Sequence, residues 1–190
     1  MPLGLPPRAY TAARDAGVRG LRLNVLYGGG IGLDQLAEYG ALARDHGWHL
    51  QLLVDARTLT PLASALAALP VPVVIDHMGH YPAHEGLDAP GVRTMLSLLA
   101  DGAWVKLSGA YRLDTAPWPH TLPLARACLA AAPTRCVWGS DWPHVAHWDR
   151  MMNVGALLDL LADWVPDPLT RAQVLVHNPR RLYGFPETHP

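Results

Sequence analysis

Short apolar segments alternate with helix-forming segments along the whole chain, and this alternation most constrains the fold. The predicted strands are 18–24, 49–55, 71–75, 104–109 and 135–138, and the predicted helices are 10–16, 33–46, 60–69, 91–100, 122–132, 154–164 and 169–176. Strands that alternate with helices predict right-handed βαβ units around a parallel sheet. The sequence therefore predicts one α/β domain. The Gly28-Gly29-Gly30 stretch is expected to be a flexible loop, and it lacks the flanking residues of a phosphate-binding motif.

The composition narrows the class of ligand. Half of the 190 residues are hydrophobic, 16% are charged, and the formal net charge is -1 at pH 7. Such a chain has enough apolar material for a buried core, but no basic field for nucleic acid and no polybasic patch for a membrane surface. Cys128 and Cys136 lack a CxxC spacing, and no apolar run is long enough to cross a bilayer. We expect a cytoplasmic protein, without a signal peptide, that acts on a small molecule.

Polar side chains gather where the predicted strands end. These residues are Arg22, Asn24, Gln51, Asp76, His77, Ser108, Tyr111, Arg112, Asp141 and His144. In a parallel sheet the C-terminal ends of the strands share one edge, and active sites form there. We therefore expect these side chains to converge on one site.

Asp141 is the most informative of these residues. It follows a short apolar strand that Gly139 ends, and it lies among Trp138, Trp142 and Pro143. A carboxylate in apolar surroundings needs a hydrogen-bonding partner or has a chemical function. The structural alternative is that Asp141 only caps a turn or a helix.

Five segments of the chain resemble one family of enzymes. They are GLRLN at 20–24, IDHMG at 75–79, KLSGAYR at 106–112, WGSDWPH at 138–144 and HNPRRLYGF at 177–185. Together, and in this order, they resemble the amidohydrolase superfamily, in particular its amidohydrolase-related branch, which includes lactonases similar to 2-pyrone-4,6-dicarboxylate lactonase. Any one segment is a weak signal, whereas five in register are specific.

The resemblance implies a TIM-barrel-like (β/α)8 fold with Asp141 at the end of the last strand. Five strands are too few to close such a barrel, which usually takes roughly 250 residues. Members of the family carry a His-x-His pair at the end of the first strand, and this sequence contains no such pair. We therefore expect residues 1–190 to correspond to the C-terminal two-thirds of a metallo-dependent-hydrolase-like domain, truncated at its N-terminus, with about five parallel strands in an incomplete barrel.

Hydrolysis of a lactone requires a base for the water and a donor to the carbonyl oxygen. Asp141 is the predicted base, with a pKa raised by the neighbouring Trp rings. His77 is the predicted carbonyl donor, or a metal ligand if a metal is bound. Asp76 is expected to point to the opposite face of the strand and to serve the structure.

The predicted substrate-binding residues surround this pair. Arg22 and Arg112 are suited to bidentate binding of carboxylates, although Arg22 could instead form an ion pair on the sheet. Asn24, Gln51 and Tyr111 are candidates for hydrogen bonds to the substrate, although a buried Gln is equally often satisfied by the backbone. His144 is expected to line the mouth of the site.

The sequence leaves the cofactor open. A catalytic zinc site takes three protein ligands and a water, and His77 and Asp141 are the only convincing pair of ligands. The lactonase branch includes metal-independent members, so the resemblance allows either no cofactor or a divalent metal such as zinc. His177-Asn178-Pro179 matches a family tail segment, and we expect it to be structural.

The leading functional prediction is a lactonase-like hydrolase that opens a carboxylated cyclic ester, with an anionic small molecule as substrate. One alternative is a metal-dependent amidohydrolase or decarboxylase of the same superfamily. Another is a non-catalytic fragment that pairs with a partner or with itself as a homo-oligomer, because an exposed sheet edge invites association.

Overall fold

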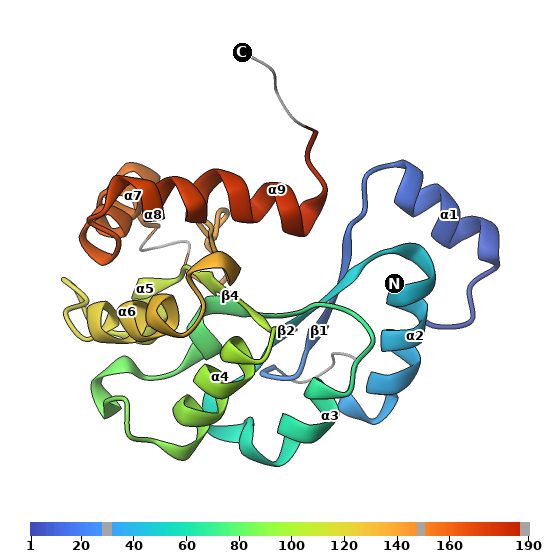
Figure 1. The fold of residues 1–190 in the computed structure, drawn as a ribbon, viewed down its shortest axis with the longest axis horizontal. Helices are drawn as coiled ribbons and strands as arrows, with labels where there is room; N and C mark the ends of the chain where they lie inside the picture. Colours follow the sequence, from blue (N-terminus) through green and yellow to red (C-terminus); the bar gives the residue numbers. More distant parts are fainter. Residues whose placement is uncertain (28–31, 148–150, 187–190) are drawn as a thin grey trace.

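A computed structural model describes residues 1–27, 32–147 and 151–186. The loop predicted at Gly28-Gly29-Gly30 lies outside the described residues. Five strands form one sheet: β1 (Gly20–Asn24), β2 (His49–Leu53), β3 (Val73–Ile75), β4 (Trp104–Leu107) and β5 (Cys136–Trp138). Each strand pairs in parallel with the next one along the chain, which gives the spatial order β1-β2-β3-β4-β5 (Figure 1). The prediction of five parallel strands is confirmed.

Helices connect and cover the strands. The α-helices are α1 (Pro7–Asp15), α2 (Leu36–His46), α3 (Ala63–Ala67), α4 (Pro90–Ala100), α5 (Ala110–Leu113), α6 (Thr121–Ala131), α7 (Val154–Trp164), α8 (Pro168–Ala172) and α9 (Asn178–Tyr183). The short 3-10 helices are η1 (Leu33–Gln35), η2 (Ala56–Thr58), η3 (Thr60–Leu62), η4 (Asp76–His80), η5 (Ala83–Glu85) and η6 (Pro133–Arg135), and η8 (Gln173–His177) is a π-helix. None of the helices in these described ranges combines the length and apolar character that crossing a membrane requires.

The predicted helix over 60–69 is in fact divided. Residues Thr60–Leu62 form η3, and the α-helix begins only at Ala63. Thr60 does not cap the helix as expected, because its hydroxyl pairs with that of Thr94 at 3.0 Å. This contact ties the β2–β3 connection to α4.

The main core lies between one face of the sheet and helices α2 to α6. Alternate strand residues contribute to it, as the period of two along a strand requires. Its fully buried members include Leu23, Leu52, Ile75 and Val105 from the strands and Leu99 from α4. Both cysteines are free and buried in this region. The other face of the sheet is therefore left to carry the polar side chains.

The C-terminal helix α9 covers part of that other face. Leu182 of α9 packs against a separate apolar cluster of Val74, Trp104 and Val137. The fully buried Asn178 amide donates to the carbonyl oxygens of Pro133 at 2.9 Å and Cys136 at 2.6 Å. Asn178 therefore ties the start of α9 to the connection before β5 and to the first residue of that strand.

Truncating the core should have a large effect on stability. Leu52→Ala removes a side chain with 0% exposure from the second strand, and such changes cost about 2–5 kcal/mol through lost burial and a residual cavity. Chemical denaturation should show this decrease in the free energy of unfolding. The matched change Leu169→Ala, at a side chain that is 80% exposed, should stay within about 0.5 kcal/mol of the parent. Equal effects at the two positions would contradict the described core.

Candidate active site

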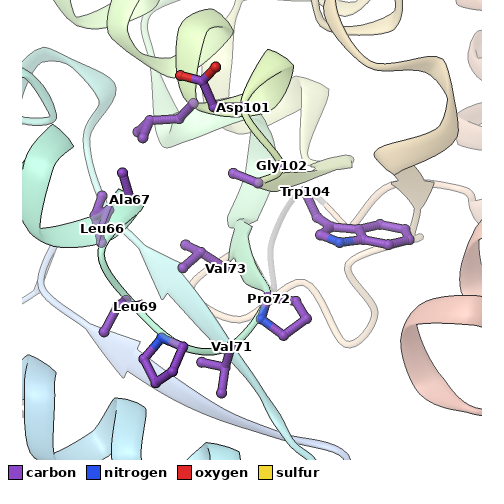
Figure 2. A pocket seen from close by; sticks show the side chains of 12 residues that line it. Leu66, Ala67, Leu69, Val71, Pro72, Val73, Asp101, Gly102 and Trp104 are labelled. Carbon is purple, nitrogen blue, oxygen red and sulfur yellow. The ribbon is translucent and has the colours of Figure 1, made fainter.

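Two cavities lie at opposite edges of the sheet. The larger, of about 560 Å³, lies at the N-terminal ends of β3 and β4, with Leu66, Leu69, Val73 and Trp104 in its lining (Figure 2). The smaller, of about 340 Å³, lies at the C-terminal edge. Its lining consists of Arg22, Asn24, Tyr27, Leu53, His77, His80, Arg112, Asp141, Val145 and Ala146. Among the residues that the structure describes, this smaller cavity brings several titratable groups together, namely Arg22, His77, His80, Arg112 and Asp141, so it is the candidate active site.

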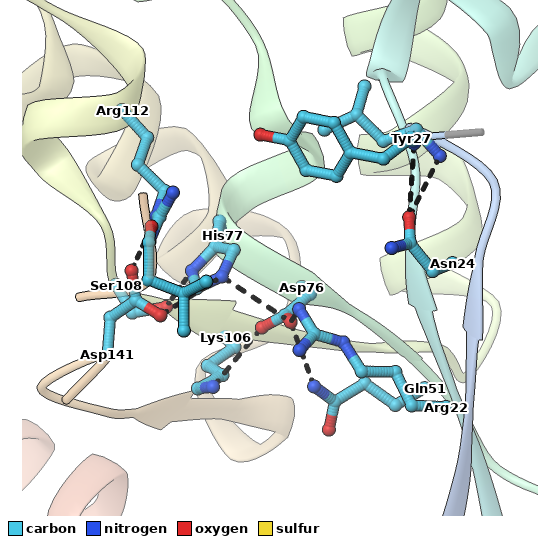
Figure 3. Close-up of polar contacts among 12 residues, drawn as sticks. Arg22, Asn24, Tyr27, Gln51, Asp76, His77, Lys106, Ser108, Arg112 and Asp141 are labelled. Atoms are coloured by element: carbon cyan, nitrogen blue, oxygen red, sulfur yellow. Dashed lines mark hydrogen bonds and ion pairs between the residues drawn. The ribbon is translucent and has the colours of Figure 1, made fainter. Parts of the chain in front are cut away.

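Asp76 is the hub of this site, contrary to the expectation that it would face away from His77. Its fully buried carboxylate accepts hydrogen bonds on Oδ2 from Arg22 Nη2 at 2.5 Å and from Gln51 Nε2 at 2.9 Å (Figure 3). Lys106 Nζ lies 3.3 Å from Oδ1. Burial by itself raises the pKa of Asp76, but His77, Lys106, Arg22 and the Gln51 hydrogen bond outweigh it and lower this pKa. Asp76 is therefore ionised at neutral pH.

The backbone explains why the expectation for Asp76 was wrong. Strand alternation ends at Ile75, and His77 and Met78 adopt left-handed conformations with φ of 46° and 48°. A non-glycine residue in this region is uncommon, and several in succession make a tight turn. This turn brings the side chains of Asp76 and His77 to the same edge of the sheet.

His77 lies at the centre of the cluster and is 2% exposed. Its Nδ1 is 2.8 Å from Ser108 Oγ, and its Nε2 is 3.5 Å from both Asp76 Oδ2 and Asp141 Oδ1. Burial lowers the pKa of His77 to about 4, although Asp76 and Asp141 oppose this shift. The ring is neutral at pH 7. Gly109 makes room for it, because a Cβ at that position, with φ of 68°, would lie 2.9 Å from Nδ1.

Asp141 is held by two donors from the segment after β4. Its Oδ2 accepts hydrogen bonds from Tyr111 Oη and from Arg112 Nε, each at 2.5 Å. Through these contacts the Asp141 carboxylate belongs to the polar cluster. It does more than cap a turn or a helix, which was the structural alternative. The backbone of Asp141 is left-handed, with φ of 63°.

The expected increase in the pKa of Asp141 is not found. Trp142 is 70% exposed, so its ring does not shield the carboxylate from water. Burial alone raises the pKa, but His77, Tyr111 and Arg112 together outweigh it, and the pKa of Asp141 lies below its ordinary value. The carboxylate is therefore ionised at neutral pH.

The other predicted substrate-binding residues have different positions. Gln51 donates to Asp76 rather than to the backbone. Asn24 lines the cavity, and its Oδ1 accepts hydrogen bonds from the amides of Leu26 and Tyr27.

His144 was expected to line the mouth of the site, but it does not. It is fully buried, and its Nδ1 lies 2.8 Å from the Tyr111 hydroxyl. The loop after Asp141 turns back at His144, which has a φ of 56°, and this turn brings the ring behind Tyr111. His144 supports Tyr111 from within the protein.

The two arginines differ in accessibility. Arg22 forms an ion pair with Asp76, which was the alternative to substrate binding, yet its side chain remains 48% exposed and lines the cavity. The Arg112 side chain is 9% exposed, and its Nη2 also donates to the Val145 carbonyl oxygen at 3.0 Å. Burial by itself lowers the pKa of Arg112, but the contacts with Asp141 outweigh it and raise this pKa.

Sequence reasoning missed three residues of the site. Lys106 contacts Asp76, and Tyr27 and His80 line the cavity. Lys106 was detectable, because a single cation within an apolar strand needs a buried partner. Nothing in the sequence around Tyr27 or His80 indicates their contact with the cavity.

The described residues do not complete a metal site. A catalytic zinc takes three protein ligands, and no group of three His, Cys, Asp or Glu residues within 1–27, 32–147 and 151–186 is placed to hold a metal ion. Asp76, the nearest additional carboxylate, is already engaged by Arg22, Gln51 and Lys106. The side chains in the described part of the chain therefore do not fit a catalytic zinc.

The open sheet and the polar cluster at its C-terminal edge define a TIM-barrel-like α/β protein. The Amidohydrolase family model matches residues 7–185, and the chain belongs to this family. It is 35% identical over 193 residues to 4-sulfomuconolactone hydrolase of Rhizobium radiobacter, an alignment that covers 92% of this chain and 62% of the relative. It is 33% identical over 187 residues to 2-pyrone-4,6-dicarboxylate hydrolase of Comamonas testosteroni, covering 91% and 61%. The chain thus spans about three-fifths of the length of these relatives.

A solved structure shows the same fold. The crystal structure of a protein from Acinetobacter baumannii, described as a probable 2-pyrone-4,6-dicarboxylic acid hydrolase with citric acid bound, superposes with a TM-score of 0.83 at 25% identity. The match covers 97% of this chain and 71% of that one. It confirms the TIM-barrel-like class of the fold. The correspondence of residues 1–190 to the C-terminal two-thirds of the family domain stays a prediction.

The buried His77 should make folding sensitive to mild acid. Its pKa is about 4 in the folded chain and near 6.5 in an unfolded one, so the unfolded state takes up the proton first. The contribution of neutral His77 to stability is complete above about pH 6.5 and decreases as the pH falls towards 4. Nitrogen-detected NMR of the ring should give the folded titration midpoint. A midpoint near 6.5 would contradict the described burial, and His77→Asn should remove this part of the pH dependence of unfolding.

Proposed function

We propose that the chain is a lactonase-like hydrolase that opens a carboxylated cyclic ester. The observation that carries this proposal is the pairing of Asp141 Oδ1 with His77 Nε2 at 3.5 Å beside a cavity that Arg22 also lines. An ionised carboxylate and a neutral imidazole that face one point are a base and a hydrogen-bond donor for attack of water on a carbonyl. The names of the two curated relatives, both hydrolases of cyclic esters, support the same chemistry.

His77 is suited to polarise the carbonyl. Two carboxylates near Nε2 favour a proton on that nitrogen, and the Ser108 hydroxyl can then donate to Nδ1. A neutral imidazole that lines the cavity can donate its Nε2 hydrogen to the carbonyl oxygen as negative charge develops there. Ser108 and Gly109 hold the ring in this orientation.

Asp141 is suited to accept and return the proton. It takes one proton from the attacking water as the hydroxyl group bonds to the carbonyl carbon. The ring C–O bond then breaks, and Asp141 returns the proton to the leaving oxygen, so that the product is the open-chain hydroxy acid or its keto tautomer. An incoming substrate carboxylate raises the pKa of Asp141 by repulsion between like charges, which makes it a stronger base in the complex.

Arg22 is suited to hold a substrate carboxylate. One guanidinium nitrogen contacts Asp76, and the half-exposed side chain lines the cavity. The citric acid bound to the Acinetobacter baumannii protein is compatible with an anionic ligand for this family. The role of Arg112 as a second anchor stays a prediction.

Replacing the base should abolish turnover without unfolding the chain. Asp141→Asn is nearly isosteric and should lower kcat for a carboxylated lactone by about 10²–10⁴-fold, the usual contribution of general base catalysis. Asp159→Asn, at an exposed position of α7, is the matched control. Steady-state hydrolysis with circular dichroism of each variant tests this. Near-normal turnover by Asp141→Asn would refute the assignment, and loss of wild-type turnover with a chelator would favour the metal-dependent alternative.

Removing the proposed anchor should act mainly on binding. Arg22→Gln keeps an N–H donor for Asp76 but removes the charge, so KM for a carboxylated lactone should rise about 10-fold or more, with a smaller effect on kcat. Arg19→Gln removes the same charge at an exposed position just before β1 and should leave KM unchanged. An unaltered KM in Arg22→Gln would exclude Arg22 as the anchor.

A further inference from the structure

The Tyr111 hydroxyl lies between two hydrogen-bonding partners. Its Oη is 2.5 Å from Asp141 Oδ2 and 2.8 Å from His144 Nδ1. A phenol has one proton to donate, so Tyr111 donates to one partner and accepts from the other. Arg112 Nε also donates to Asp141 Oδ2, at 2.5 Å, and a neighbouring guanidinium disfavours a proton on that oxygen. The Tyr111 proton is therefore directed to Asp141.

This direction determines the tautomer of His144. Because Tyr111 Oη uses its proton in the bond to Asp141, it is an acceptor towards His144, and Nδ1 of the imidazole carries a proton. His144 is fully buried, and its Nε2 has no hydrogen-bonding partner within the described part of the chain. In folded proteins a buried N–H without an acceptor is rarer than a buried acceptor without a donor. The surroundings of Nε2 therefore favour the same tautomer.

The loop after β5 connects His144 to the base itself. The amide of His144 donates to the Asp141 carbonyl oxygen at 2.8 Å, and the amide of His147 donates to the His144 carbonyl oxygen at 2.9 Å. The rings of His144 and His147 contact the Tyr111 ring edge-on, with centroid distances of 5.4 and 5.0 Å and interplanar angles of 69° and 80°. Both histidines thus hold the tyrosine ring, and His144 also forms a hydrogen bond with its hydroxyl.

The two oxygens of the Asp141 carboxylate differ as a result. Oδ2 accepts hydrogen bonds from Tyr111 and Arg112, each at 2.5 Å. Oδ1 has one longer contact among the described residues, 3.5 Å to His77 Nε2 (Figure 3). An oxygen that already accepts two short hydrogen bonds is a weaker base, whereas Oδ1 keeps lone pairs for a water molecule.

We propose that His144 is a positioning residue for the base. Its Nδ1–H donates to the Tyr111 hydroxyl oxygen, which directs the tyrosine proton to Asp141 Oδ2 and leaves Oδ1 as the oxygen that takes the proton from water. The proton transfer from water rests on the proposed function, whereas the direction of the two hydrogen bonds depends only on the contacts of the three side chains. His144 is buried behind Tyr111, so it acts through that residue.

The tautomer of His144 can be measured without any turnover. Long-range 1H–15N correlation spectra of the labelled 190-residue chain distinguish a protonated ring nitrogen from a bare one, and the spectrum of His144→Asn assigns the resonances. At pH 7 we expect a proton on Nδ1 of His144 and none on Nε2. The exposed His84 is the control and should exchange between both tautomers. A proton on Nε2 alone, or on both ring nitrogens, would overturn the proposal.

Turnover tests whether His144 acts through Tyr111. His144→Leu removes the N–H donor and should lower kcat for a carboxylated lactone about tenfold, with little change in KM. His144→Asn keeps an N–H near the position of Nδ1 and should retain most of the activity, and His84→Asn should match the parent. In a Tyr111→Phe background, the two His144 substitutions should change kcat by less than about twofold, because the hydroxyl group is gone.

Two kinetic results would contradict the positioning role, provided that the circular dichroism spectra match the parent. One is an equal loss of kcat in His144→Leu and His144→Asn, because the N–H donor would then be irrelevant. The other is a full additional loss when His144→Leu is combined with Tyr111→Phe. If His144→Leu does not fold, the tautomer of the unmodified chain still decides.

The two proposals can fail separately. A chain that hydrolyses no lactone would refute the proposed function, while the NMR spectrum would still decide the direction of the hydrogen bonds. A chain that hydrolyses a lactone and carries the proton of His144 on Nε2 would support the function and refute the positioning role.

Discussion

The buried carboxylate of Asp76 is the interaction on which the rest of the site depends. Removing a charge from water costs several kcal/mol, and an ion of this kind is stable only when charged or hydrogen-bonding partners surround it. Its partners come from three strands: Arg22 from β1, Gln51 from β2 and Lys106 from β4. Arg22 and Gln51 are also direct neighbours in the register of β1 and β2. The requirement to satisfy one anion therefore links the strands and fixes the directions of Arg22 and Lys106.

The turn after β3 places the His77 imidazole next to the Asp76 carboxylate. Left-handed residues such as His77 and Met78 store strain of about 1–3 kcal/mol each, and such strain persists only where the surroundings enforce it. Here the surroundings are the packed ring of His77, its contact with Ser108, and the space left by Gly109. The strain has a chemical consequence, because it brings the imidazole between two carboxylates and keeps it out of water.

Two differently balanced charge clusters result from this arrangement. At one end Arg112 and Asp141 neutralise each other, and at the other Asp76 is shared by two cations. This asymmetry gives the cavity a direction, with a neutral ion pair at the Asp141 end and two cations around one carboxylate at the Arg22 end. A symmetric pair of arginines, as the sequence alone suggests, would have treated both ends of a substrate alike.

Local patterns in the sequence determined the five parallel strands and the edge at which the polar residues meet. Apolar periodicity and strand-ending glycines act over a few residues, so they can be read without knowledge of the fold. The side of Asp76, the lowered pKa of Asp141 and the burial of His144 were decided only by the tertiary structure. Burial and Coulomb interactions join residues that are distant in the chain, such as Arg22 and Asp76, 54 residues apart, and Tyr111 and Asp141, 30 apart. A sequence shows that a carboxylate follows a strand, whereas only the fold decides which cations reach it and whether water does.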